Sequence, residues 1–389
     1  MVDRSWRVHQ PLPRANSLNV ALAHHWLVRM RGGERVLEQL CLLFEAAPIY
    51  TLVARKGTTS ALIDSHSIIR SRLNRLPFAV THYRQMLPLF PWAVGTLHVD
   101  GATDLLISSD ASVIKGLSYR EGIPHICYCH SPPRYLWDEQ DTYLRYTSGL
   151  RSGGRAFFRA VSRYVREFDR RAAQRVTHFI ANSEFVRGRI ARCYERQAEV
   201  IHPPVDTGAF TPRKEREEFY LIVSELVAYK RVDLAVHAFS RNGKPLVIIG
   251  DGPERAHLTQ LARKNVRFLG RQPRAEIIRY FERCCGFIHP QVEDFGITAV
   301  EAQAAGAPVI ALHRGGACET VLDTITGLFF EDATVDALCD ALERFENSTF
   351  DPLRCAENAH RFRPDVFVTN FREMLARQLP KLFTRASLP

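Results

Sequence analysis

Short apolar runs alternate with segments of helical pattern along almost the whole chain, and this alternation restricts the fold more than any other feature. Parallel strands joined by helices produce such a pattern, so the sequence predicts parallel sheets built from strand-helix-strand units. The first half contains strand candidates at residues 18–25, 49–54, 104–110, 125–131, 178–183 and 198–204. The second half contains strand candidates at residues 219–226, 245–252, 266–270, 286–291, 308–312 and 326–330.

The two sets of strands are separated by residues 203–219, which are polar and contain prolines, glycine and charge, as linkers do. A chain of 389 residues is long enough for about two domains. The sequence therefore predicts an α/β fold of two Rossmann-like parallel-sheet domains, over residues 1–206 and 207–365. The C-terminal helix, within residues 366–389, is expected to complete the N-terminal domain.

The composition is that of an ordinary soluble protein, with 46% hydrophobic and 24% charged residues. Apolar runs long enough to span a membrane are missing, and the first residues lack the apolar core of a signal peptide, so we expect a cytoplasmic chain. The nine cysteines have no framework or zinc-site spacing, which favours reduced thiols and no metal.

The formal charge of +10 indicates an anionic partner but does not choose among nucleotide phosphate, acidic lipid and nucleic acid. No nucleic-acid-binding motif accompanies the charge, so nucleic acid is not expected. Residues 70–97 mix basic and apolar side chains, as a helix lying in a lipid headgroup layer does. Peripheral contact of this segment with an anionic membrane is therefore one open interpretation; the other is that the segment does not bind a membrane. The residues concerned are Arg70, Arg72, Arg75, Phe78, Tyr83, Arg84, Leu87, Phe90 and Trp92.

Two glutamates, Glu293 and Glu301, stand on either side of an expected junction between a strand at 286–291 and a helix at about 297–305. On that helix Glu301 shares one inward-facing stripe with apolar residues. A carboxylate there needs strong donors, because an unpaired buried charge is costly; ligand hydroxyls or a buried arginine could supply them. Glu293 lies at the carboxyl end of the strand, where open α/β sheets bind substrates, so the two together favour a ligand site.

Glycine turns follow strands in both halves, at Gly33, Gly252 and residues 315–316. A glycine backbone can approach a phosphate closely, although each such turn alone is more often an ordinary connection. Lys230 lies between a strand and a helix, where its ammonium could neutralise a diphosphate or remain solvated. His130 ends another strand, and a position facing a cleft slightly favours function over a structural role.

Longer motifs then become recognisable. The segment EDFGITAVEAQAAGAPVIA has two glutamates with seven residues between them and a small-residue stretch, and IGDGPE, FLGRQP and GGACETV occupy further loops. The N-terminal half contains GGERVL, YCHSPPRYLWD, ANSEFVRGRI and IHPPVD. From about residue 18 to 385 the chain resembles the retaining glycosyltransferases of family 4, and its N-terminal motifs resemble those of the bacterial mannosyltransferase-like members that build surface polysaccharides. That resemblance implies the GT-B fold, in which two Rossmann-like domains face each other across a cleft.

The resemblance also implies a role for each matched position. Glu301 would hold the ribose hydroxyls of a nucleoside-diphosphate sugar, with GDP-mannose favoured. Glu293 would face the transferred hexose, and His130 would position the sugar and the leaving phosphate, so these two are the expected catalytic residues. The other expected donor-binding residues are Gly33, Lys230, Arg231, Gly252, Arg271, Phe295, Gly296 and Ile297.

In this family retention is explained by front-face attack, in which the leaving diphosphate takes the acceptor proton, and neither a cofactor nor a metal is expected. The acceptor would be a glycan or a lipid-linked oligosaccharide at the inner face of the cell membrane. One position departs from the family. Its members commonly have an arginine that clamps the diphosphate five residues before the lysine matched by Lys230, and this chain has Glu225 there. Either Arg231 or another cation replaces this clamp, or donor binding is weakened. A weakened non-catalytic relative therefore remains an alternative. A sugar-nucleotide epimerase is a second one, because it can share this architecture.

Overall fold

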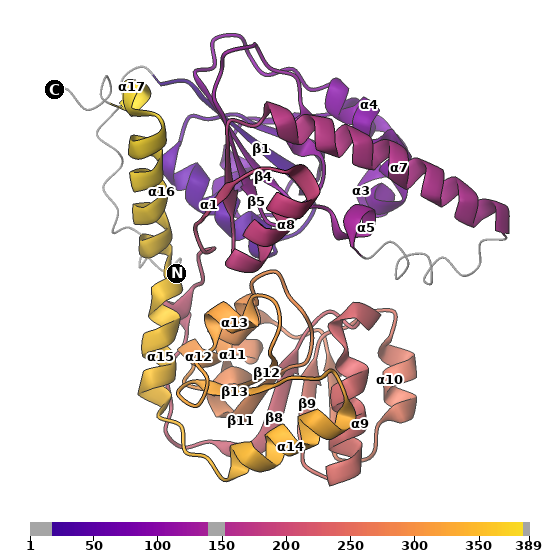
Figure 1. The fold of residues 1–389 in the computed structure, drawn as a ribbon, viewed down its shortest axis with the longest axis vertical. Helices are drawn as coiled ribbons and strands as arrows, with labels where there is room; N and C mark the ends of the chain where they lie inside the picture. The colour runs from indigo at the N-terminus through magenta and orange to yellow at the C-terminus, as the bar shows by residue number, and fades with distance from the viewer. Residues whose placement is uncertain (1–17, 139–151, 384–389) are drawn as a thin grey trace. The chain divides into compact units, whose positions relative to one another are not determined.

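A computed structural model describes residues 18–138 and 152–383 (Figure 1). The chain forms two compact units: residues 1–204 with 364–389, called unit 1, and residues 205–363, called unit 2. The sequence placed the boundary two residues later, after residue 206. The predicted absence of a signal peptide concerns residues 1–17, which lie outside the described residues.

Unit 1 contains a seven-stranded sheet in the order β3-β2-β1-β4-β5-β6-β7, with every neighbouring pair parallel. Its strands are β1 (Val20–Leu27), β2 (Ile49–Ala54), β3 (Ile68–Arg70), β4 (Leu105–Asp110), β5 (His125–Cys129), β6 (His178–Ala181) and β7 (Ala198–Val200). Its helices are α1 (Gly32–Leu43), α2 (Ala61–Ser65), α3 (Ala79–His82), α4 (Phe90–Gly95), α5 (Arg134–Trp137), α7 (Ser152–Arg175), α8 (Glu184–Tyr194), α16 (Pro364–Gln378) and α17 (Pro380–Phe383).

Unit 2 contains a six-stranded parallel sheet in the order β10-β9-β8-β11-β12-β13. Its strands are β8 (Glu217–Val223), β9 (Leu246–Ile249), β10 (Val266–Gly270), β11 (Cys284–His289), β12 (Val309–Leu312) and β13 (Gly327–Phe330). Its helices are α9 (Val232–Asn242), α10 (Arg255–Leu261), α11 (Arg274–Arg283), α12 (Ile297–Ala304), α13 (Ala317–Thr320), α14 (Val335–Glu346) and α15 (Pro352–Ala359).

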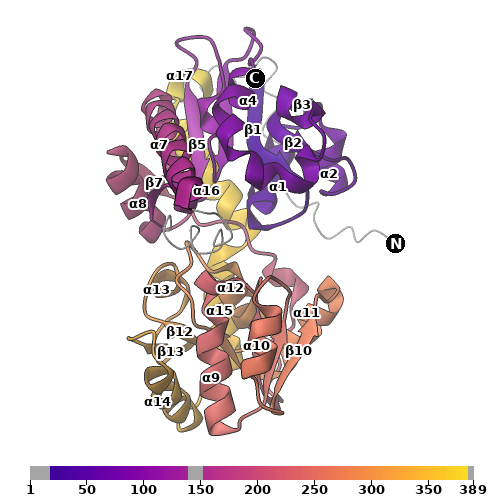
Figure 2. The ribbon, with the colours of Figure 1, turned by 90° about the vertical axis from the view of Figure 1, so that its right-hand side faces the viewer.

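Each sheet has apolar cores on both of its faces, because successive side chains of a strand point to opposite faces. On β1, Leu22 belongs to the core beneath α1 and α16, whereas Ala23 belongs to the core beneath α4. On β8, Leu221 and Ile222 divide between the two cores of unit 2 in the same way. Helices therefore cover both faces of each sheet, as Figure 2 shows, which fits the near-continuous apolar strands of the sequence.

All twelve predicted strands are present, and the structure adds one, β3. The predicted C-terminal helix is present as two pieces, α16 and α17. The helix is interrupted before Pro380, since proline lacks the N–H that would continue it. Phe367 of α16 packs edge-on against Tyr128 of β5 at 5.8 Å between ring centroids, so this helix belongs to the core of unit 1. Residues 384–389 of the predicted segment lie outside the described residues.

Both sheets have the strand order in which the winding direction reverses once. The reversal falls between β1 and β4 in unit 1 and between β8 and β11 in unit 2. At such a point the connections leave the two neighbouring strands toward opposite faces, which opens a crevice at the carboxyl ends of the strands. The loops that follow β1, β4, β8 and β11 are therefore where the fold favours ligand binding.

The segment 70–97, whose composition suggested a helix in a headgroup layer, contains several short elements. It folds as β3, two 3-10 turns and the short helices α3 and α4, and Tyr83, Leu87 and Phe90 are buried in the core. Phe78 and Trp92 remain 75% and 47% exposed. Only part of the apolar side chains assigned to a membrane face is therefore at the surface. Over residues 18–138 and 152–383, no helix has the length and apolarity needed to cross a membrane.

Candidate functional site

The reversal point of unit 2 brings Lys230 and Glu293 together. Lys230 ends a 3-10 turn that follows β8, and Glu293 follows the neighbouring strand β11. The Lys230 ammonium donates a hydrogen bond to Glu293 Oε1, and Gln291 Nε2 donates to the same oxygen at 3.0 Å. The side chains of Lys230 and Glu293 are 17% and 23% exposed, so the ion pair is only partly open to solvent. The structure thus joins two residues for which the sequence implied separate roles.

The carboxylate of Glu293 is strongly stabilised in its ionised form. Burial raises its pKa, but the charge of Lys230, the neighbouring His289 and the hydrogen bonds outweigh burial and lower the pKa to about 2. Burial lowers the pKa of His289 to about 4, so this imidazole is neutral at physiological pH. At that pH the pair is a carboxylate and an ammonium, and Glu293 is a very weak base.

The loop from Glu293 to α12 is held by the glycines that precede α13. Gly316 N donates to Glu293 O at 2.9 Å, and a Cβ on Gly316 would lie 2.3 Å from Phe295 Cα. Gly296 has a φ of +92°, a conformation that glycine adopts readily, and α12 begins at the next residue, Ile297. The ring of Phe295 is buried, so this residue can offer a ligand only its backbone. The helix start therefore lies beside Glu293.

Glu301 projects from α12 and is 12% exposed, between the buried and the surface side chains of the helix. Arg274, at the start of α11, forms an ion pair with it at 2.7 Å between Nη1 and Oε1. Arg274 is itself 42% exposed and lies over the ring of Phe210, 5.1 Å from its centroid. An arginine is thus one partner of Glu301, and this arginine reaches solvent and could be displaced.

The other expected donor-binding residues of unit 2 have local roles in this structure. Gly252 packs against the loop after β8, where an added Cβ would lie 2.2 Å from Leu226 O, and its N–H donates to Asp251 Oδ1 at 2.9 Å. Arg231 has a φ of +50° and its Nε lies 3.3 Å from Asp233 Oδ1. Arg271 is exposed directly after β10. Their contacts with a donor stay predictions.

In unit 1 the structure brings Gly33 and His130 together. Gly33 lies in the first turn of α1, and a Cβ added to it would lie 3.3 Å from His130 Nε2. The backbone N of His130 donates to Asp110 O at 2.8 Å, which fixes the chain where β5 ends. The glycine therefore leaves room for the imidazole, which is a reason for its identity that does not involve a phosphate.

Three further residues around His130 were not expected from the sequence. Ser109 Oγ lies 2.8 Å from His130 Nε2 and 3.1 Å from His24 Nδ1, and His25 Nδ1 lies 3.3 Å from Ser109 O. Burial lowers the pKa of all three imidazoles to about 3, so each is neutral at physiological pH. The signal in the sequence was the polar end of two otherwise apolar strands, at His24-His25 and at Ser108-Ser109-Asp110.

A buried charge cluster lies next to these imidazoles. Lys115 is 1% exposed, and its ammonium contacts Asp110 Oδ2 at 3.2 Å, Ser112 O at 3.0 Å and the carboxylate of Asp169. Asp169 also accepts from Trp137 and Tyr194, at 3.0 and 2.8 Å. The cluster joins β4, α7 and α8 and has no solvent access, so its role is structural.

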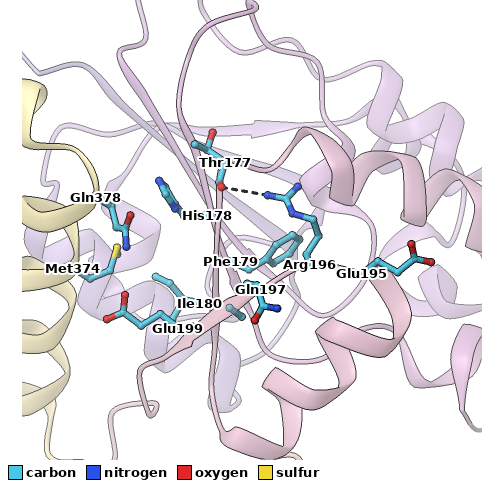
Figure 3. A pocket seen from close by; sticks show the side chains of 11 residues that line it. Thr177, His178, Phe179, Ile180, Glu195, Arg196, Gln197, Glu199, Met374 and Gln378 are labelled. Atoms are coloured by element: carbon cyan, nitrogen blue, oxygen red, sulfur yellow. Dashed lines mark hydrogen bonds between the residues drawn. The ribbon is translucent and has the colours of Figure 1, made fainter.

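One cavity of unit 1, of about 390 Å³, lies away from these residues (Figure 3). His178, Ala198 and Glu199 line it at the amino ends of β6 and β7, together with Met374 of α16. Sheets of this kind bind ligands at the carboxyl ends of their strands, so this cavity is a poor candidate for the donor site. Within the described ranges no group of three or more metal-ligating side chains could hold a metal ion.

Comparison with known proteins identifies two family models. Residues 30–209 match the model described as Glycosyltransferase Family 4, and residues 208–362 match the model described as Glycosyl transferases group 1. Together the two matches cover residues 30–362, which include parts of unit 1 and nearly all of unit 2.

Curated relatives are similar over part of the chain. A GDP-mannose-dependent alpha-(1-6)-phosphatidylinositol monomannoside mannosyltransferase of Mycobacterium tuberculosis (strain ATCC 25618 / H37Rv) is 33% identical in an alignment 192 positions long, which covers 41% of this chain and 50% of that protein. A D-inositol 3-phosphate glycosyltransferase of Mycobacterium sp. (strain JLS) is 30% identical in an alignment 152 positions long, which covers 33% of this chain and 35% of that protein. The similarity thus spans half of these relatives or less.

Solved structures match almost the whole fold. Sucrose-phosphate synthase from Thermosynechococcus elongatus has a TM-score of 0.67 at 16% identity, covering 94% of this chain and 100% of that one. Anabaena HepE in complex with UDP has a TM-score of 0.66 at 17% identity, covering 92% and 100%. At such identities the likeness concerns the fold alone, and it confirms the GT-B fold class, with its two parallel-sheet α/β domains.

Proposed function

Because the chain belongs to glycosyltransferase family 4, we propose that it is a retaining transferase that moves a hexose from a nucleoside-diphosphate sugar to a glycan or lipid-linked oligosaccharide of the cell surface. The observation that carries the proposal is the Lys230–Glu293 pair at the reversal point of unit 2. Mannose is the favoured sugar and GDP-mannose the favoured donor, since the names of relatives contain GDP-mannose.

Unit 2 is the proposed donor-binding unit. Lys230, with Arg231 in place of the usual clamp, would neutralise the diphosphate, and the backbone at the start of α12 would donate to phosphate or sugar oxygens. Glu301 would exchange Arg274 for the two ribose hydroxyls, since an exposed arginine can return to water at little cost. Gly252 and Arg271 would contribute backbone contacts. In unit 1, Gly33 and His130 would contact the diphosphate and the sugar.

Retention by front-face attack is supported by the proton affinities of the candidate bases. A general base works best when its pKa lies near the operating pH. The pKa values of Glu293 and His130, about 2 and about 3, are far below that range. We therefore propose that the leaving diphosphate takes the acceptor proton and that Lys230 stabilises its charge. Metal independence is part of the same proposal.

The experiment that tests this function has two steps. Thermal shift with a panel of nucleoside diphosphates and their sugars should give the largest rise in melting temperature with GDP and GDP-mannose, because a ligand of the native state stabilises it. Transfer of radiolabelled mannose to a membrane lipid extract should then give an extractable glycolipid. Conversion of the donor sugar without transfer would indicate an epimerase. Binding with neither transfer nor hydrolysis would indicate a non-catalytic relative.

The first variant concerns the ribose. Glu301→Ala should weaken GDP binding by about tenfold or more, because a hydrogen bond to a charged group contributes about 1.5–3 kcal/mol. Isothermal titration with GDP and 2′-deoxy-GDP gives the sharper measurement. The wild type should prefer GDP, and Glu301→Ala should bind both alike. Glu276→Ala, on α11 in an exposed ion pair with Arg279, is the matched control and should retain the preference. An unchanged preference in Glu301→Ala would contradict the ribose role.

Peripheral membrane contact remains a proposal for the exposed part of residues 70–97. Between Asp64 and Asp100 the sequence contains no acidic residue, and four arginines and two aromatic rings of this segment are exposed. The exposed residues are Arg70, Arg72, Arg75, Phe78, Arg84 and Trp92. Basic residues near an anionic leaflet contribute about 1 kcal/mol each, and exposed rings can enter the interface.

The double variant Phe78→Ser/Trp92→Ser should therefore bind vesicles containing anionic phospholipid at least about tenfold more weakly, because burying one large apolar side chain contributes about 1.5–3 kcal/mol. Cosedimentation at low and high salt measures this. Leu353→Ser, an exposed apolar residue of unit 2 that is 56% accessible, is the control and should bind as the wild type does. Equal binding of the wild type to neutral vesicles would contradict a contribution of the arginines to binding.

A further inference from the structure

We propose that Glu34, His24 and Ser109 are positioning residues, which form a buried chain that determines which ring nitrogen of His130 carries its proton. The inference deepens the proposed function, since it takes His130 to act on the donor. It concerns residues to which neither the family motifs nor the site described above gives a part in the reaction.

This buried chain of side chains runs through three elements of unit 1 near the reversal point of its sheet. Glu34 belongs to the first turns of α1, His24 to β1 and Ser109 to β4. His24 Nδ1 lies 3.1 Å from Ser109 Oγ, and this hydroxyl lies 2.8 Å from His130 Nε2. The three positioning side chains are buried, with exposed fractions of at most 2%. Water is therefore excluded as a competing partner along the chain.

The other ring nitrogen of His24 faces Glu34. His24 Nε2 and Glu34 Oε1 are 3.6 Å apart, and neither atom has a hydrogen-bond partner among the described residues. A buried polar atom without a partner costs about 1–3 kcal/mol. A hydrogen bond between His24 Nε2 and Glu34 Oε1 would satisfy both atoms, and a shift of a few tenths of an ångström would form it. Glu34 is therefore the end of the chain at which a charge can change.

The single proton of the Ser109 hydroxyl couples the two imidazoles. If Ser109 donates to His24, it must accept from His130, so His130 carries its proton on Nε2. If Ser109 accepts from His24 and donates to His130, the proton of His130 must be on Nδ1. An ionised Glu34 can only accept, which requires the proton of His24 on Nε2 and selects the first state. A protonated Glu34 can donate to His24 and permits the second state.

Burial lowers the pKa values of the imidazoles and keeps them neutral, although the charge of Asp110 acts to raise those values. Glu34 is therefore the titrating member. His25 packs against His24, with 4.1 Å between ring centroids, and Asp110 and Arg29 act on the cluster by their charges. Burial raises the pKa of Glu34 and outweighs the opposing charge of Arg29. The change of state should therefore occur above the usual range of a glutamate. His130 would remain neutral through it.

Nitrogen NMR of histidine-labelled protein tests the inference without any turnover. The ring signals of His130, assigned by their loss in His130→Asn, should change as the pH falls. The proton should be on Nε2 at the alkaline end and move to Nδ1 as Glu34 becomes protonated. In Glu34→Gln, which retains hydrogen bonding but cannot titrate, and in Ser109→Ala, this dependence should disappear.

The same strand offers a matched control. Ser108 Oγ lies 2.8 Å from His125 Nε2, also buried, but the next residue on a strand points to the opposite face. Ser108→Ala should therefore leave the His130 signals as in the wild type. If His130 in the wild type keeps one tautomer at every pH, or if Ser109→Ala follows pH as the wild type does, the inference is wrong.

Kinetics give the second readout. Ser109→Ala should lower kcat by about tenfold or more, as outer-shell partners of functional imidazoles do, with little change in the donor KM, and Ser109→Thr should restore it. Ser108→Ala should retain kcat. Activity of His130→Asn equal to the wild type would remove His130 from the proposed function but leave the NMR result standing. If the wild type shows the expected change of tautomer but Ser109→Ala retains the wild-type kcat, the positioning role is wrong.

Discussion

Replacement of Lys115 by methionine is expected to lower the free energy of unfolding of unit 1 by about 3–5 kcal/mol, because it leaves two buried carboxylates without their counter-ion. Asp110 and Asp169 are both at most 1% exposed. Attraction by Lys115 outweighs burial at Asp110, so that its pKa lies below the ordinary range. The sequence of unit 2 contains no tryptophan, whereas Trp26, Trp92 and Trp137 lie among the described residues of unit 1, so tryptophan fluorescence during urea unfolding does not report on unit 2.

The deficit of Lys115→Met should shrink as the pH falls. Without Lys115, burial would raise the pKa of both carboxyls above their unfolded values, so the folded state would bind more protons than the unfolded one. Stability then decreases as the pH rises through that window and recovers below it. Adding Asp169→Asn removes one of the charges and should recover part of the loss at neutral pH. A pH-independent deficit would mean that lost packing, rather than charge, is responsible.

An exposed ion pair on α7, the helix that contains Asp169, gives the matched control. Arg171 and Glu167 of α7 are 77% and 51% exposed, so Arg171→Met should cost less than about 1 kcal/mol. A similar loss in both variants would contradict a special role for the buried cluster. Since Asp110 of the cluster follows Ser109, Lys115→Met also separates stability from function: a loss of kcat at a temperature where the variant is folded would show that the cluster acts on the reaction as well.

The sequence was sufficient for the fold because its strands are buried on both faces and therefore appear as short continuous apolar runs. It was insufficient for β3, a three-residue edge strand that ends in Arg70. In residues 70–97, composition indicated an amphipathic surface, but the chain changes between 3-10 turns and short helices. A single helical period cannot tell there that Tyr83 and Phe90 point inward whereas Phe78 points outward.

For the candidate site, single positions could be predicted but their partners could not. Lys230 and Glu293 were both selected as strand-end residues, yet they are 63 residues apart in the chain, and only the strand order makes β8 and β11 neighbours. Glu301 needed a donor, and the sequence could not choose Arg274 from among many arginines. The contact of His24 with Ser109 spans 85 residues, and no motif marks it.

The Lys230–Glu293 pair leads to opposite expectations for its two members, and this makes it the most decisive test of the proposed site. Glu293→Ala should lower kcat by about a hundredfold or more, comparable to the loss of one preorganised electrostatic group. Its affinity for GDP should remain unchanged or increase, because the carboxylate no longer competes with phosphate for the ammonium of Lys230. Lys230→Met should instead weaken GDP binding, since the diphosphate loses its cation and meets the charge of Glu293.

Titration with GDP and steady-state kinetics with GDP-mannose separate these effects, because a group that acts only in the transition state changes kcat without changing ground-state binding. Glu293→Gln distinguishes charge from shape: it can still accept from Gln291 but has no charge, so its kcat should fall nearly as far as that of Glu293→Ala. Glu276→Ala again serves as the exposed control. If Glu293→Ala weakens GDP binding as strongly as Lys230→Met does, Glu293 holds the lysine in place rather than facing the sugar. The carboxylate would then be a positioning residue for the diphosphate, and the sugar-facing group would have to be sought elsewhere along the loop to α12.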